Sequence, residues 1–141
     1  MTTAFTIKHI REVGFQMNRE LTLESDLKNH LKVAFLLLLQ FEKDSNTIGL
    51  HTIAKYTYDD QELLSGGATF VVDVPRWTEV SHDIEEVRKY PWVKDLLIYS
   101  MGFVSGQHYK SSAGTPLNSV FLPYISPEDM LNMLVIDEVK K

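Results

Sequence analysis

The chain has 141 residues, a formal net charge of −5 and no cysteine. Its content of 44% apolar and 23% charged residues is typical of a folded domain and argues against an intrinsically disordered chain. The acidic balance argues against binding to nucleic-acid backbones or anionic membranes, and the lack of cysteine excludes disulfides and thiolate metal sites. The N-terminal residues lack the basic and apolar regions of a secretory signal, so we expect a cytoplasmic protein that does not insert into a membrane.

Two segments near the N-terminus have the character of strands. Residues 4–17 predict a strand with a β-bulge near residues 10–12, where His9 and Arg11 interrupt its apolar side. Residues 20–27 predict a short second strand.

The most apolar run of the chain lies at 31–41 and is too short to cross a bilayer, which needs about 20 residues. Its odd positions are apolar throughout and its even positions only in the middle, which predicts a strand buried on one face and covered at the centre of the other. With the polar turn at 43–46 and the alternating run at 47–58, it predicts an antiparallel hairpin. A buried helix over 31–41 is the alternative. Because one small sheet cannot cover both faces, the pattern also predicts an oligomer.

The second half of the chain predicts mainly helices. Residues 61–79 are expected to form a connection whose apolar stretch is an edge strand or an extended arm. Residues 81–110 predict a helix capped by Ser81 and a second, longer helix that begins at Pro91. Glycine and serine at 100–106 predict the close approach of another backbone. A short helix capped by Ser126 closes the chain. The prediction is a single α+β domain over residues 1–141.

No motif for catalysis or metal binding is present. The five histidines show no HxH or HxxxH spacing, and GFVSG at 102–106 has valine where a nucleophile elbow needs serine. The segment SGG at 65–67 is too short for a phosphate-binding loop. We therefore expect a protein that is not an enzyme and that needs no metal or cofactor, with an enzyme as a minor alternative.

Two surfaces are candidates for binding. Apolar side chains on irregular segments predict either lids over the core or a groove for extended apolar peptide; they are Phe70, Val72, Val74, Trp77, Phe121, Leu122 and Tyr124. The acidic strand end at Asp59 and Asp60 predicts either a solvated turn or a docking point for a basic partner.

The order of these features resembles the SecB family of export chaperones. FTIKHI at 5–10 is similar to the family's opening strand, residues 30–58 resemble its central hairpin, and LPYISPEDMLNML at 122–134 resembles its ending. The resemblance implies a four-stranded antiparallel sheet followed by a long helix and a short C-terminal helix, assembled as a dimer or a tetramer. It also implies that unfolded or precursor polypeptides are held in apolar grooves without ATP or a cofactor.

The resemblance assigns roles to particular residues. It implies that the client groove is lined by Phe70, Val72, Val74, Trp77, Phe121 and Leu122. Glu12 keeps an acidic position with which the family docks the SecA motor, whereas Gln16 and Thr52 stand where acids are expected. We therefore predict a divergent member that serves export or a dedicated client such as an antitoxin, with Glu12, Asp59 and Asp60 as docking residues. A SecB-like binding or scaffold domain without chaperone activity is the alternative.

Overall fold

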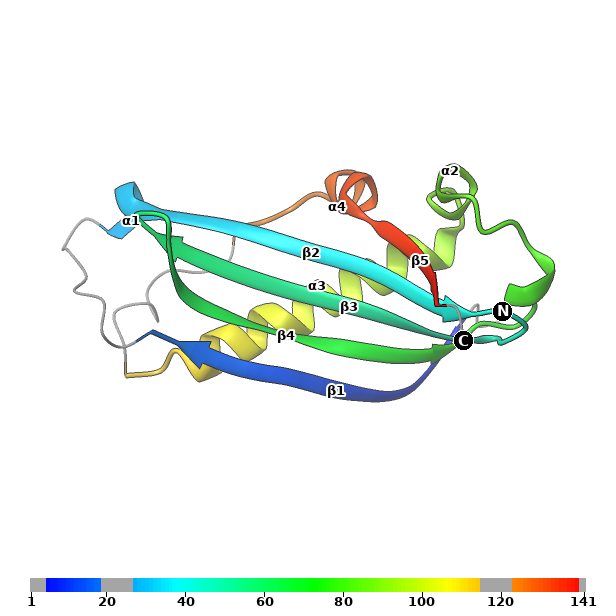
Figure 1. Cartoon of the computed structure of the whole chain (residues 1–141), viewed down its shortest axis with the longest axis horizontal. Helices are drawn as coiled ribbons and strands as arrows, with labels where there is room; N and C mark the ends of the chain where they lie inside the picture. Colours follow the sequence, from blue (N-terminus) through cyan, green and yellow to red (C-terminus); the bar gives the residue numbers. More distant parts are fainter. Residues whose placement is uncertain (1–4, 19–26, 115–122, 140–141) are drawn as a thin grey trace.

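The computed structural model describes residues 5–18, 27–114 and 123–139 as two layers, a sheet and the helices that cover one of its faces (Figure 1). The strands follow the order β1-β4-β3-β2-β5 across the sheet. Their bounds are Thr6–Met17 for β1, Leu31–Glu42 for β2, Thr47–Tyr58 for β3, Gln61–Asp73 for β4 and Val135–Val139 for β5. The helices are α1 (Leu27–His30), α2 (Ile84–Val87), α3 (Pro91–Ser111) and α4 (Pro127–Met133), with a 3-10 turn, η1, at Trp77–Glu79. The predicted strand at 20–27 lies outside the described residues, except for Leu27, where α1 begins.

The predicted hairpin is confirmed as β2 and β3, which pair antiparallel from Leu31 opposite Tyr58 to Phe41 opposite Ile48. The odd positions of β2 face α3 and α4, where Leu37 and Leu39 are fully buried. The even positions face away from the helices, and this open face leaves Leu36 44% exposed. The alternative of a buried helix over this run is therefore wrong.

β4 is a central strand, whereas the sequence predicted a connection whose apolar stretch is an edge strand or an extended arm. It pairs with β3 on one side and with β1 on the other, so its even-numbered side chains are enclosed between the sheet and α3. The backbones of β3 and β4 approach closely at Gly67, where a Cβ atom would lie 2.8 Å from Ile53 Cα. The irregularities of β1 fall between Ile7 and His9 and between Val13 and Gln16, on either side of the position predicted for the bulge.

The C-terminal strand β5 was not predicted, and it changes the sheet from four antiparallel strands to five strands of mixed direction. β5 runs parallel to β2, with Leu38 opposite Val135 and Glu42 opposite Val139. α4 ends at Met133 because Leu134 takes an extended conformation. The β-branched residues that follow favour a strand at a free sheet edge. The fold is still α+β, with the long helix and the short C-terminal helix where the sequence predicted them.

The helices begin at the predicted proline and serine signals, with one difference. Pro91 opens α3, and the Oγ atom of Ser126 accepts a hydrogen bond of 3.1 Å from the Asp129 N–H at the start of α4. At α2 the cap is Asp83, not Ser81: its Oδ1 atom accepts from the Glu85 N–H at 3.1 Å. Within the described ranges, no helix is long and apolar enough to span a membrane.

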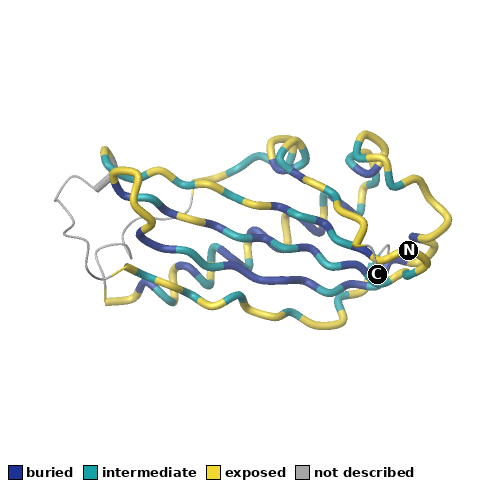
Figure 2. Tube along the Cα trace, viewed as in Figure 1, coloured by how far each residue is buried: buried dark blue, intermediate teal, exposed yellow. Residues whose placement is uncertain are grey.

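The core lies between the sheet and the helices, and the buried parts of β2, β3 and β4 run along its length (Figure 2). Trp77 closes one end of this core. It is fully buried, His82 stacks on it with ring centroids 4.3 Å apart, and Phe41 meets it edge-on at 5.2 Å. A smaller cluster of Tyr56, Tyr58, Leu63 and Leu64 forms the opposite end.

We predict that Gly67→Ala destabilises the protein by about 3 kcal/mol, the upper part of the range for overpacking, because the new methyl group meets backbone atoms that cannot turn away. Gly14→Ala is the matched control, since no described atom lies within 4 Å of the position that its new methyl group would take. Urea denaturation of the two variants measures the difference. Equal stability would contradict the close approach of β3 and β4.

Candidate functional site

Most of the residues predicted to line a client groove are in the core. Phe70 and Val72 lie on β4 and point toward α3, and Val74 and Trp77 follow β4 directly. None of the four exposes more than 3% of its surface, so none can touch a client in this structure. The prediction failed because it treated 61–79 as an irregular surface segment. Phe121 and Leu122, the other two predicted residues, lie outside the described residues.

The predicted docking residues do not form one surface. Asp59 and Asp60 make the β3–β4 turn in left-handed conformations, and they face His30 Nδ1 at 2.8 Å and Lys32 Nζ at 3.7 Å. Glu12 lies opposite Ala68 on the edge strand β1, about 25 Å along the sheet from this turn. Ala68 is buried on the side of α3, so Glu12 lies on the helical side and not on the open face.

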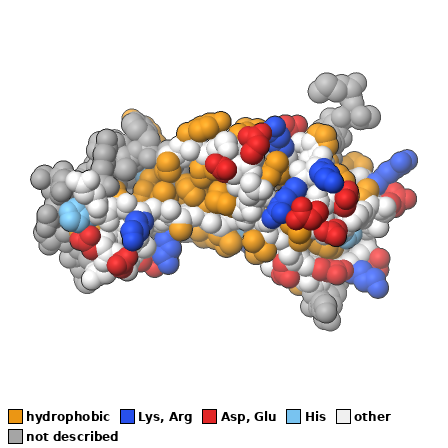
Figure 3. Space-filling model, turned by 90° about the horizontal axis from the view of Figure 1, so that it is seen from above, with side chains coloured by type: hydrophobic (Ala, Val, Ile, Leu, Met, Phe, Trp, Pro, Cys, Tyr) orange, Lys and Arg blue, Asp and Glu red, His pale blue; other side chains and the backbone are white. Residues whose placement is uncertain are grey.

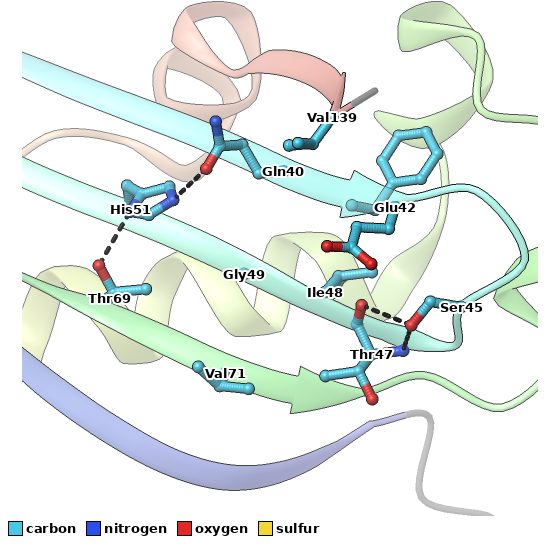
Figure 4. Close-up of a pocket in the computed structure, with 11 residues that line it drawn as sticks. Gln40, Glu42, Ser45, Thr47, Ile48, Gly49, His51, Thr69, Val71 and Val139 are labelled. Carbon is cyan, nitrogen blue, oxygen red and sulfur yellow. Dashed lines mark hydrogen bonds between the residues drawn. The ribbon is translucent and has the colours of Figure 1, made fainter. Parts of the chain in front are cut away.

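The open face of the sheet carries a hollow of about 410 Å³ above Gly49, lined by both polar and apolar residues (Figure 4). At its border, His51 Nε2 lies 2.7 Å from Gln40 Oε1, and His51 Nδ1 lies 2.8 Å from Thr69 Oγ1. Gln40 in turn donates from Nε2 to Asp137 Oδ2 at 3.3 Å. Burial, and then the positive charge of Arg11, lower the pKa of His51 from its ordinary value of 6.5. His51 is therefore neutral at pH 7, and its ring links neighbouring strands through hydrogen bonds that it makes within the protein.

A second open cavity lies between α3 and the chain that leads into α4, and we call it the α3–α4 cavity. Its volume is about 430 Å³, and no lining residue is charged. Ile98, Met101, Gly102 and Ser105 of α3 form one wall; Pro123, Tyr124, Ile125, Pro127 and Met130 form the other. Ile98 is 45% exposed and Tyr124 is 86% exposed. Such a surface, uncharged, concave and partly open, is suited to apolar side chains of another molecule.

An unpaired sheet edge lies on the same side of the molecule as this cavity. α4 packs against both α3 and β2, and β5 pairs with β2 only from Leu38 to Glu42. Between Leu31 and Leu37, no strand in the described part of the chain pairs with the outer edge of β2. Seen from above, this side shows a band of hydrophobic side chains near the middle of the molecule, with charged side chains toward both ends (Figure 3).

The structure contains neither a metal-binding nor a nucleophilic constellation in its described ranges. No group of three histidine, aspartate or glutamate side chains there could hold a metal ion. Ser105 lies inside α3 on the wall of the α3–α4 cavity. The prediction that the protein is not an enzyme stays a prediction.

Comparison with known proteins supports the fold only. No protein-family profile and no curated protein matches the sequence. The structure is similar to the Mycobacterium tuberculosis SecB-like chaperone Rv1957, solved in complex with a ChAD peptide from the Rv1956 HigA1 antitoxin. The TM-score is 0.54 at 14% identity, over 87% of this chain and 88% of that one. The fold is SecB-like. A Streptococcus agalactiae protein of unknown function aligns at a TM-score of 0.36 and 13% identity, over 85% of this chain and 93% of that one, which carries no functional argument.

Sequence reasoning identified only part of the α3–α4 cavity. Tyr124 was noted as an apolar residue on an irregular segment, and it is the most exposed of the large apolar side chains described. The wall on α3 was missed, although Ile98, Met101, Gly102 and Ser105 follow the three- and four-residue spacing of one helix face. Small residues beside apolar ones on that face were the available signal for a concave surface.

We predict that the free energy of unfolding decreases as the pH falls from 7.5 to 5. The unfolded chain binds a proton at His51 near pH 6.5, whereas the folded chain, with its lowered pKa, binds that proton only at lower pH. The contribution of neutral His51 to the free energy of unfolding is fully present above pH 6.5 and is lost as the pH falls below that value. Urea denaturation across this range should show a smaller pH dependence for His51→Gln than for the unmodified protein. An unchanged dependence would contradict the lowered pKa.

Proposed function

We propose that the protein is an ATP-independent chaperone that holds extended, apolar segments of unfolded polypeptides in the α3–α4 cavity. The observation that carries the proposal is this cavity of about 430 Å³, uncharged and open, beside an unpaired edge of β2. The SecB-like fold adds support, because a chaperone of similar fold was solved with a bound peptide.

Two kinds of interaction would hold the client. Apolar client side chains would enter the α3–α4 cavity, and a fully buried one contributes about 1.5–3 kcal/mol before the cost of ordering the chain. The backbone of an extended client would pair with the N–H and C=O groups of β2 between Leu31 and Leu37. Backbone pairing is independent of sequence, so the site would select clients for apolar, extended character.

The partners follow from this site. Clients are unfolded or precursor polypeptides, or one dedicated client such as an antitoxin, in the cytoplasm and without a cofactor. Docking to the SecA motor has less support, because Thr52 is fully buried against α3 and Glu12 lies on the helical side. A binding or scaffold domain without chaperone activity is the second candidate. It would bind one folded partner and would not suppress aggregation.

We also propose that the protein forms a dimer or a tetramer through the outward side of α3. Tyr99, Gly106 and Tyr109 are exposed there, and no described atom outside the helix lies within 4 Å of a Cβ built on Gly106. Glycine costs about 1 kcal/mol in a helix interior relative to alanine, and close contact with a second copy would offset that cost. Several client sites on one oligomer would then bind a single long polypeptide together.

The chaperone proposal predicts that Ile98→Ser combined with Tyr124→Ser weakens client binding by about 5- to 30-fold, corresponding to about 1–2 kcal/mol of lost apolar burial. Suppression of the aggregation of a denatured protein without ATP, and binding of a labelled apolar peptide, measure the effect. Val80→Ser is the control, because this exposed side chain lies neither in the cavity nor on α3. Equal loss in the control and in the paired variant would place the client site elsewhere, and failure of the unmodified protein to suppress aggregation would favour the scaffold.

The assembly proposal predicts that Gly106→Leu separates the oligomer while raising the stability of the single chain by about 0.5–1 kcal/mol through helix propensity. Sedimentation gives the oligomeric state, and urea denaturation gives the stability. A variant that stays assembled would show that this side of α3 faces solvent, and a single-chain protein at micromolar concentration would remove the proposal.

A further inference from the structure

β5 is attached to the sheet by few side chains. Of its five residues only Ile136 is partly buried, where it packs against the main core, and Val135 is 52% exposed. The pair of β5 with β2 is also the one parallel pair of the described sheet, and parallel pairs are slightly less stable per residue. A segment with so few buried contacts can leave the sheet while the rest of the fold stays intact.

The residues immediately before β5 are held much more firmly. Leu134 and Met130 are buried in the core. Arg88 donates from Nε to the Leu131 carbonyl oxygen at 2.9 Å and from Nη2 to the Asn132 carbonyl oxygen at 3.4 Å. α4 therefore stays in place when β5 moves, and the point of flexure lies between Leu134 and Val135.

A hydrogen-bonded relay on the open face holds β5 against β2. Thr69 donates to neutral His51 at Nδ1, His51 donates from Nε2 to Gln40 Oε1, and Gln40 donates from Nε2 to Asp137 on β5. Because His51 fixes which way the Gln40 amide points, the amide donor faces the Asp137 carboxylate. The hydrogen bond from Gln40 to Asp137 is thus a side-chain contact that holds the weakly packed β5 against β2, and we call it the latch.

β5 also occupies part of the edge on which the proposed client would pair. The open part of this edge, from Leu31 to Leu37, is seven residues or about 23 Å long. A client that extends further along β2 meets β5 at Leu38. We propose, resting on the proposed function, that β5 is a built-in competitor: short extended clients bind beside it, and longer ones must displace it from β2.

A reversible lock between β2 and β5 tests this competition in the full-length chain. Gln40→Cys combined with Asp137→Cys places two cysteines at partnered positions, and the chain has no other cysteine. Oxidation fixes β5 to β2, and reduction leaves β5 without its latch. Binding of two labelled, unstructured apolar peptides, one of 6 and one of 16 residues, is followed by fluorescence anisotropy. We expect the oxidised protein to bind the long peptide about tenfold more weakly than the reduced protein, and the short peptide equally.

Two further variants keep the test decisive. Lys55→Cys combined with Ser65→Cys joins β3 to β4 away from the β2 edge, and its oxidation should change neither affinity. Ile136→Asp frees β5 without cysteine chemistry and should tighten binding of the long peptide about tenfold over the unmodified protein. The proposed role of β5 would be overturned if neither the disulfide nor Ile136→Asp changed the affinity for the long peptide. It would also be overturned if the affinities for the two peptides changed equally. Absence of binding by the unmodified protein would overturn the proposed function itself.

Discussion

The packing of α3 across β3 and β4 determines where every other surface of the molecule lies. Phe70 of β4 is fully buried under α3, with its ring centroid 5.5 Å from that of Phe103 and 6.1 Å from that of Tyr99. Thr52 donates to Ser100 Oγ at 3.0 Å within the same contact, and Ser100 donates to the Leu97 carbonyl oxygen at 3.0 Å, so both of these buried hydroxyl groups are satisfied. One layer of helices covers one face of a sheet. The other face, the outer side of α3 and the edge of β2 are therefore the surfaces that remain for partners.

The sequence predicted the elements whose signals are local. The two-residue period of β2 and β3 spans the whole hairpin, and proline or serine marks the starts of α3 and α4. An edge strand was one of the two predictions for the apolar stretch of 61–79, but the central position of β4 was missed because its apolar run does not alternate and its neighbours, including β1, are set by distant pairing. The turn before it contains Asp59 and Asp60 in left-handed conformations. Glycine or asparagine at these positions would have indicated a hairpin turn more clearly than aspartate does. β5 was missed because a five-residue strand at a free edge is decided by tertiary contacts, and the preceding helical pattern runs into it without a break.

The site was harder to predict than the fold, for the same reason. Whether a side chain is exposed depends on the topology of the whole fold. Val72 and Trp77 are buried because β4 is a central strand, although their sequence context is that of a surface segment. The α3–α4 cavity depends on how α4 returns over α3, which no local pattern specifies. Glycine and serine at 100–106 indicated that another backbone approaches α3, but they did not indicate that part of this helix borders an open cavity.

The two outermost strands bring the ends of the fold to the same end of the sheet. β1 begins at Thr6, opposite Asp73, and β5 ends at Val139, opposite Glu42; Asp73 and Glu42 both lie beside the β2–β3 turn (Figure 1). Four strand spacings of about 4.8 Å separate β1 from β5, a gap of about 19 Å that a linker of about eight residues spans. The chain is thus suited to circular permutation, with new termini in the exposed turn at Asp59 and Asp60. Joined in this way, β5 would be tethered to β1, and its excursions from β2 would be limited by the length of the linker.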